Sequence, residues 1–171
     1  INYSDDGWKW AVVIAYDSRH KCTEFRLEVA LVLAGNGISA YLFDELRPTP
    51  ELSFAVRELD AIGGIVITAS HNPAQYNGYK VYWEDGGQVV PDQAREIIAE
   101  INEIEDFELV KMIEKKQAID QGLLKIIGKD IDDRYIAEML KVVPEKELAK
   151  QKGDDLSIIY TPLHGTGTKL V

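Results

Sequence analysis

Short apolar runs alternate with segments of helical spacing in the first half of the chain. β-Branched and aromatic residues dominate residues 10–16, 38–43 and 63–68, and each run has the length of a buried strand. Apolar side chains recur at helical spacing in the two intervening segments, residues 23–34 and 51–59. This order of strand, helix, strand, helix and strand predicts a parallel sheet covered by helices and joined by right-handed crossovers.

The second half of the chain predicts one more strand and several helices. Apolar and polar positions alternate over residues 79–83, and Asp85-Gly86-Gly87 predicts the turn that ends this strand. Helices are predicted over residues 91–105, 108–119 and 131–142, the first with a single apolar stripe. The sequence therefore predicts an α/β fold with three layers, α/β/α, around a mixed, mostly parallel sheet.

Near its end the sequence predicts a domain boundary. Residues 144–155 are polar and highly charged and contain a glycine, as linkers often do. Residues 156–162 predict a new strand, and residues 164–171 predict a new loop and helix. We therefore expect one domain over residues 1–153 and the opening strand and loop of a second, truncated domain over residues 154–171.

Charge and composition narrow the classes of partner. The chain has 19 Lys and Arg against 29 Asp and Glu, a formal net charge of −10, which disfavours nucleic acid and anionic membranes. A local cluster of backbone N–H groups and cations would still bind an anionic metabolite. The first ten residues lack the basic and apolar regions of a signal peptide. Cys22 is the single cysteine, which excludes an intrachain disulfide and favours a cytoplasmic location.

Candidate chemistry is concentrated in the stretch TASHNPAQYNGYK, which begins at Thr68. It follows the third predicted strand, and ligands gather at the carboxyl ends of strands in an open α/β sheet. Pro73 restricts the backbone locally, and Asn77-Gly78 is a turn signal that folds the loop back. We therefore predict that the Ser70 hydroxyl is exposed and that Lys80 returns towards it.

Several chemistries use an exposed serine, and they fit this stretch unequally. Acyl transfer needs a base that reaches Ser70, but His71 is its sequence neighbour and such side chains normally diverge; the G-x-S-x-G elbow is also absent. A Walker-type phosphate loop is absent as well. Phosphoryl transfer through a phosphoserine, with Lys80 as cation or proton carrier and a metal ion, accounts for the most residues.

A non-catalytic interpretation is the alternative. Ser and Asn before Pro are common turn formers, so the chain would then be an α/β binding module whose Ser-His loop is an ordinary turn. Asp17 and Arg19 are candidates for an ion pair that holds the first loop. His164 and Gly165 look more typical of a turn that enters a helix than of a reactive centre.

Four motifs together resemble the α-D-phosphohexomutase superfamily, which includes phosphoglucomutases and phosphomannomutases. Residues 68–80 resemble its active-site serine loop, and Ala15-Tyr16-Asp17-Ser18-Arg19 resembles its first-strand motif. Arg47-Pro48-Thr49-Pro50 is similar to the crossover before the serine strand, and residues 160–167 are similar to the strand that opens the second domain. The Arg-bearing, Gly-rich motif that normally precedes the first strand is not matched by residues 1–10.

The resemblance implies roles for individual residues. Ser70 would be the phosphoserine and, through its phosphate, one ligand of Mg²⁺; Lys80 would be the general acid or base, with His71 close to the reacting hydroxyl. The implied substrate-binding residues are Asn72, Asn77 and Arg19. The Asp ligands that complete the Mg²⁺ site belong to the family's second domain and lie outside this sequence.

The resemblance also implies a reaction and its partners. Family members interconvert hexose 1-phosphate and hexose 6-phosphate through a sugar bisphosphate, so a sugar phosphate, a sugar bisphosphate and the remaining domains are the expected partners. Residues 77–83 and 85–88 are most similar to the glucose and pentose branch. We therefore expect glucose as the sugar, with phosphomannomutase or phosphopentomutase activity as alternatives, and we expect this segment alone to be inactive.

Overall fold

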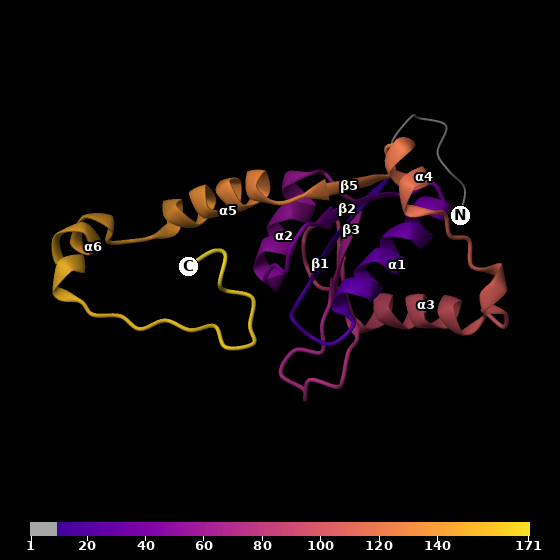
Figure 1. The fold of residues 1–171 in the computed structure, drawn as a ribbon, viewed down its shortest axis with the longest axis horizontal. Coiled ribbons are helices and arrows are strands. Elements are labelled where there is room, and N and C mark those ends of the chain that lie inside the picture. Colours follow the sequence, from indigo (N-terminus) through magenta and orange to yellow (C-terminus); the bar gives the residue numbers. More distant parts are fainter. Residues whose placement is uncertain (1–9) are drawn as a thin grey trace.

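The computed structural model of the protein describes residues 10–171, in which a five-stranded sheet forms the centre (Figure 1). The strand order is β4-β3-β1-β2-β5. Four strands run parallel, and only β4 is antiparallel to its neighbour β3. The strands are β1 (Ala11–Tyr16), β2 (Ser39–Phe43), β3 (Gly63–Ile67), β4 (Tyr79–Trp83) and β5 (Leu124–Ile127). The predicted mixed, mostly parallel sheet is therefore confirmed.

Helices cover both faces of the sheet and complete the three predicted layers. On one face, α1 (Cys22–Gly35) and α4 (Lys115–Asp120) pack against β1, β2 and β5. On the other face, α2 (Thr49–Glu58) and α5 (Lys129–Val142) pack against β1, β2 and β3. Gly64 allows the close approach of α2, since a Cβ atom there would lie 2.7 Å from Val56 Cγ2. The core thus consists of two apolar layers that fix the sheet from both sides.

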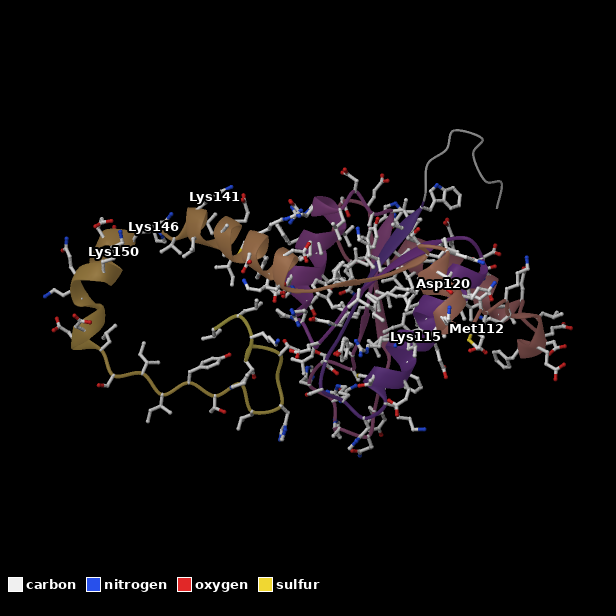
Figure 2. The ribbon with its side chains drawn as sticks, turned by 45° about the horizontal axis from the view of Figure 1, so that its top comes forward. Met112, Lys115, Asp120, Lys141, Lys146 and Lys150 are labelled. Carbon is white, nitrogen blue, oxygen red and sulfur yellow. The ribbon has the colours of Figure 1, made fainter. Side chains whose placement is uncertain are left out.

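Two further helical segments lie at the periphery. α3 (Pro91–Asn102) runs beside α1 and has no fully buried residue. α6 (Lys146–Lys152) continues beyond α5 and is followed by a 3₁₀ turn, Gly153–Asp155. Lys141, Lys146 and Lys150 mark this arm, which extends away from the sheet before the chain returns towards it (Figure 2). The polar stretch that we predicted as a boundary is therefore mostly helical.

The segment between α3 and β5 differs from the prediction. Instead of a helix over residues 108–119, the chain forms a 3₁₀ turn, Phe107–Leu109, and the short helix α4. The backbone at Lys111 and Met112 lies against Gly35, where an added Cβ would meet Lys111 O at 2.7 Å. This close backbone contact replaces the predicted helix. The sequence analysis did not predict β5. This strand has only four residues, and its two central side chains are exposed, so its hydrophobic pattern is too short to indicate a strand.

The predicted strand over residues 156–162 is wrong, as is the predicted helix over residues 164–171. Within the described part of the chain, these residues form neither strand nor helix, and Ile159 is 99% exposed. A strand needs a neighbour for its backbone hydrogen bonds, and no strand of the described sheet pairs with this segment. The predicted absence of a signal peptide and the unmatched Arg-bearing, Gly-rich motif concern residues 1–9, which lie outside the described residues. No helix among those described is long and apolar enough to cross a membrane.

Candidate active site

The topology brings two loops together at one edge of the sheet. From β1 the chain crosses through α1 to β2 on one side, and then through α2 to β3 on the other side of β1. The loops that follow β1 and β3 therefore begin at adjacent strand ends, where the Asp17 N–H donates to the Ile67 carbonyl at 3.2 Å. Such a reversal of strand order is where open α/β sheets form ligand crevices.

The loop after β3 is closed at its base and presents a strained serine. The Thr68 N–H donates to the Gly78 carbonyl at 2.9 Å, which joins the two ends of the loop. Ser70 lies at φ +56°, in the left-handed region that side chains other than glycine rarely adopt. Its N–H donates to Thr68 Oγ1 at 2.9 Å, and its side chain is exposed. The predicted exposure of the Ser70 hydroxyl is therefore observed.

Ser70 and His71 lie closer together than neighbouring side chains normally do. Ser70 Oγ is 3.4 Å from His71 Nδ1. The left-handed backbone of Ser70 changes the relative direction of the two side chains, so the general expectation that they diverge is wrong here. The arrangement allows His71 to exchange a proton at or near the serine hydroxyl.

Two adjoining cavities open at Ser70. The larger has a volume of about 570 Å³ and is lined by Ser70 and Arg19. All three histidines of the protein, His20, His71 and His164, line it as well. The smaller, about 290 Å³, lies between Ser70 and residues that include Thr68, Arg47 and Thr166. A cavity with basic and hydroxyl side chains suits an anionic, hydroxylated ligand.

Lys80 lies on β4 at the flank of these cavities. It is half-buried and pairs with Val66 across the antiparallel ladder, so the two side chains share a face of the sheet. Val66 lines the smaller cavity. Among the described residues no hydrogen bond or ion pair joins Lys80 to Ser70. The proton-carrier role of Lys80 stays a prediction.

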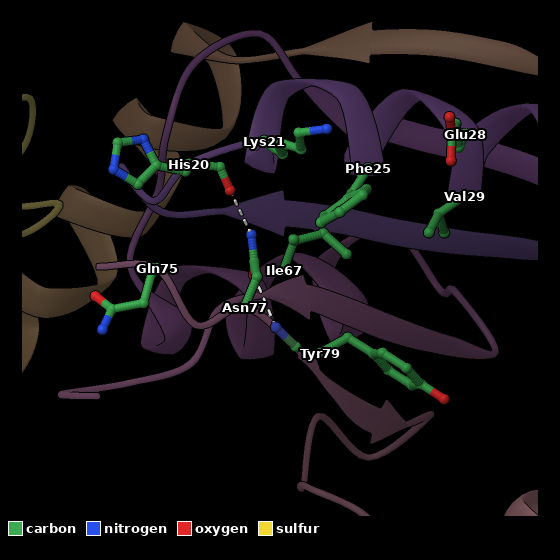
Figure 3. Close-up of a pocket in the computed structure, with 10 residues that line it drawn as sticks. His20, Lys21, Phe25, Glu28, Val29, Ile67, Gln75, Asn77 and Tyr79 are labelled. Carbon is green, nitrogen blue, oxygen red and sulfur yellow. Dashed lines mark hydrogen bonds between the residues drawn. The ribbon is translucent and has the colours of Figure 1, made fainter. Parts of the chain in front are cut away.

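The predicted substrate-binding residues occupy three different environments. Asn72 is exposed and lines the larger cavity beside Ser70. The Asn77 side chain instead donates to the His20 carbonyl at 2.9 Å and to Cys22 Sγ at 3.2 Å, and lines a third cavity, about 670 Å³, behind the loop (Figure 3). The Arg19 guanidinium faces the backbone carbonyls of the serine loop. Asn72 and Arg19 therefore both line the larger cavity at Ser70, whereas Asn77 lines neither of the two cavities there.

Asp17 stands at the centre of the hydrogen bonds below the loop. Its Oδ2 lies 3.3 Å from Arg19 Nε, which confirms the predicted ion pair. The same oxygen accepts the Thr68 hydroxyl at 2.6 Å, and Oδ1 accepts the Arg19 N–H at 3.0 Å and the Cys22 thiol at 3.2 Å. Burial raises the pKa of the Cys22 thiol.

Sequence reasoning missed Thr68 and undervalued the segment around His164. Thr68 is a buried hydroxyl at the end of an apolar strand, and that combination was the available signal. His164 and Gly165 were interpreted as a turn that enters a helix rather than as a reactive centre, and they line the larger and the smaller cavity respectively. The Ser18 hydroxyl donates to the His164 carbonyl, which ties this segment to the first loop.

A buried charge cluster forms the wall behind the smaller cavity. Arg47 is 1% exposed, and its guanidinium donates to both carboxylate oxygens of Asp132 and to Asp44. Glu51 is fully buried beside it, and neither of its carboxyl oxygens has a hydrogen-bond partner. Burial first, and the neighbouring Asp132 second, raise the pKa of Glu51 from 4.5 to about 8. This raised pKa favours the protonated, neutral form of Glu51.

The residues present do not make a Mg²⁺ site by themselves. Among those described, no group of three or more His, Cys, Asp or Glu side chains is placed to hold a metal ion. Asp17 lines the smaller cavity with Ser70, but its two oxygens already accept hydrogen bonds from Thr68, Arg19 and Cys22. Mg²⁺ needs several oxygen ligands in octahedral geometry, and this donor set is incomplete.

The sequence matches a known domain family. The family described as phosphoglucomutase/phosphomannomutase, alpha/beta/alpha domain I, matches residues 4–108. The chain is 39% identical over 161 residues to a phosphoglucomutase of Staphylococcus saprophyticus. That alignment covers 94% of this chain and 28% of the relative. The chain thus spans little more than a quarter of the length of the curated relatives it matches.

Solved structures share the fold. A phosphoglucomutase/phosphomannomutase family protein from Burkholderia thailandensis superimposes with a TM-score of 0.57 at 25% identity, over 78% of this chain and 28% of that one. The open form of the exocytosis-sensitive phosphoprotein pp63/parafusin from Paramecium gives a TM-score of 0.76 at 19% identity, over 95% of this chain and 33% of that one. The second likeness concerns the fold alone.

Proposed function

Because the chain belongs to the phosphoglucomutase/phosphomannomutase family, we propose that it carries the phosphorylated serine of an enzyme that interconverts hexose 1-phosphate and hexose 6-phosphate. One observation carries this proposal: the Ser70 hydroxyl is exposed on a strained, left-handed residue at the mouth of two cavities. Backbone strain of this kind is concentrated at functional sites.

The proposed reaction moves one phosphoryl group at a time. The P–O bond of phosphoserine 70 breaks as a sugar hydroxyl attacks phosphorus, and the proton of that hydroxyl passes to a base. Ser70 leaves as a hydroxyl or alkoxide and recovers a phosphoryl group from the other end of the sugar bisphosphate. Atoms and charges balance over the cycle, and the net result is an isomerisation.

The proposed base is Lys80, and His71 assists at the serine oxygen. Lys80 lies on the same sheet face as Val66, and Val66 lines the smaller cavity. An extended Lys80 side chain would bring its amine to a sugar bound in that cavity. His71 Nδ1 is already 3.4 Å from Ser70 Oγ. Asn72 and the imidazoles of His20 and His164 supply polar contacts to a phosphate in the larger cavity.

Groups outside this sequence complete the proposed enzyme. Phosphorylated Ser70 would be one ligand of Mg²⁺, and Asp side chains of a second domain would supply the others, because the residues described here do not suffice. We divide the chain into a first domain over residues 1–153 and the beginning of a second over residues 154–171. Residues 163–166 line the two cavities at Ser70, which supports this division of the chain. A second domain that begins with these residues would start next to the proposed active site.

Glucose is the proposed sugar, and the cytoplasm the proposed location. The relatives at 39% and 40% identity from Staphylococcus are phosphoglucomutases, which favours glucose over mannose. The single buried cysteine supports a reducing compartment. The substrate, the bisphosphate intermediate and the further domains are therefore the proposed partners.

The test is covalent labelling of the natural full-length protein. We expect incubation with glucose 1,6-bisphosphate to add one phosphoryl group, which intact-mass measurement and peptide mapping assign to Ser70. Ser70→Ala should abolish the adduct and mutase activity. Ser18→Ala is the matched control, because Ser18 lines the same cavity, and it should retain the adduct. An adduct on another residue, or near-normal activity of Ser70→Ala, would contradict the proposal.

A further inference from the structure

Arg19 reaches from the loop after β1 across to the serine loop after β3. One terminal nitrogen donates to the carbonyls of Pro73, at 2.9 Å, and Tyr76, at 3.2 Å. The other donates to the carbonyls of Asn72, at 2.7 Å, and Ser70. The side chain is only 10% exposed. A single guanidinium thus holds four backbone carbonyls of the loop that carries the nucleophile.

The terminal nitrogens of Arg19 make four hydrogen bonds within the chain, and Nε is buried without a hydrogen-bond partner. A guanidinium has five N–H donors in a rigid fork. Four of them face the loop carbonyls, and Nε lies 3.3 Å from Asp17 Oδ2, an ion pair without hydrogen-bond geometry. No accessible donor therefore remains for a sugar phosphate, which argues against the direct substrate contact that the family resemblance implies for Arg19.

Asp17 connects this clamp to the nucleophile by a second route. Its carboxylate accepts the Thr68 hydroxyl at 2.6 Å, and Thr68 Oγ1 in turn accepts the Ser70 N–H at 2.9 Å. The chain of contacts from Asp17 through Thr68 fixes the N–H side of Ser70, while Arg19 fixes its carbonyl side. Both peptide groups that flank the serine are therefore restrained.

We propose that Asp17 and Arg19 are positioning residues that hold Ser70 in its left-handed conformation and so aim its hydroxyl into the cavities. A left-handed backbone is sterically unfavourable for a residue with a side chain, so an unrestrained loop would leave this conformation. Charge-assisted hydrogen bonds from a planar fork oppose that relaxation. The catalytic part of this inference rests on the proposed function, whereas the restraint of the loop does not.

The experiment combines amide hydrogen exchange with steady-state kinetics on the natural full-length protein. Arg19→Lys keeps the positive charge but removes the planar guanidinium that binds several carbonyls at once. Asp17→Asn is a second, independent variant, which keeps the test possible if Arg19→Lys folds poorly. We expect faster exchange of the amides of residues 69–78 in both. We also expect kcat to fall by about 10- to 100-fold while KM for glucose 1-phosphate stays within about threefold. Arg95→Lys, at an exposed position on α3, is the matched control and should change neither quantity.

The outcomes separate the clamp from the proposed reaction. A raised KM with unchanged kcat in Arg19→Lys would assign Arg19 to substrate binding and overturn the inference. Unchanged exchange of residues 69–78 in both variants would overturn it as well. If the wild-type protein takes no phosphoryl group on Ser70 but exchange still accelerates in the variants, the clamp stands and the proposed function fails. If labelling is normal and the variants behave as wild type, the function stands and the clamp fails.

Discussion

Arg47 and Asp132, 85 positions apart in the sequence, are joined by two hydrogen bonds of 2.7 and 2.9 Å. They connect the crossover before α2 to the first turn of α5, on the wall of the smaller cavity. Burial raises the pKa of Asp132, but the hydrogen bonds and charge of Arg47, together with the neighbouring Glu51 and Lys169, lower that pKa overall. Glu51 Oε2 lies 3.8 Å from Arg47 Nε, so three carboxyl groups, those of Asp44, Glu51 and Asp132, surround one buried cation.

Glu51 makes the stability of the protein depend on pH. In the unfolded chain its carboxyl group loses a proton near pH 4.5, whereas in the folded protein it keeps the proton up to about pH 8. The folded state therefore binds more protons between these values, and the free energy of unfolding falls as the pH rises through this window. Glu51→Gln removes the titration, so we expect it to stabilise the protein at pH 8.5 relative to pH 5 by about 1–4 kcal/mol.

Urea denaturation of both proteins at the two pH values measures this difference. Glu96→Gln, an exposed position on α3, serves as the control and should show no such dependence on pH. Equal effects of Glu51→Gln at pH 5 and pH 8.5 would show that the buried carboxyl group does not titrate in this window.

Gly86 is expected to tolerate no side chain. It has φ +75°, and an added Cβ would lie 2.5 Å from the Ser53 carbonyl of α2. Gly37 has the same φ but open space around it, which makes it a matched control. We expect Gly86→Ala to lower the free energy of unfolding by about 2–3 kcal/mol and Gly37→Ala by about 1 kcal/mol. Equal losses in denaturant titrations would mean that the contact with α2 adjusts freely.

Cys22 is expected to resist thiol reagents in the folded protein. Its side chain is 1% exposed, and burial raises the pKa of the thiol, which lowers the fraction of reactive thiolate at pH 8. We expect labelling by a disulfide reagent to be at least about 100-fold slower than in urea. Asn77→Ala removes the side-chain amide that contacts Cys22 Sγ, so it should make the thiol more accessible and accelerate labelling. Equal rates in folded and unfolded protein would contradict the observed burial.

Backbone strain at Ser70 predicts an unusual stability ranking. Ser70→Ala and Ser70→Gly both remove the hydroxyl, but only glycine adopts φ +56° without steric cost. We expect Ser70→Gly to be more stable than Ser70→Ala by about 0.5–1 kcal/mol, because the relief of strain exceeds the added entropy of the unfolded chain. Thermal unfolding of the two variants gives the comparison, and a more stable Ser70→Ala would argue that the loop is unstrained.

Local sequence patterns determined the fold class, the alternation of strands and helices up to β4, and the serine motif. Those features follow from residue periodicity and turn chemistry, which act over a few positions, so residues 10–16 and 63–68 predicted β1 and β3 closely. β5 and the irregular segment at Lys111 depend on contacts with distant neighbours, β2 and Gly35, and the sequence carries little local sign of them.

At the site, the sequence identified the candidate side chains, because Ser70, His71 and Asn72 form one contiguous motif. Only the tertiary structure decided how they are held. The parallel order of β3, β1 and β2 places Arg19 against a loop more than fifty residues later, and the return of the C-terminal segment towards the first loop brings His164 to the same cavity. Such contacts arise from the packing of whole elements, which no short stretch of sequence encodes.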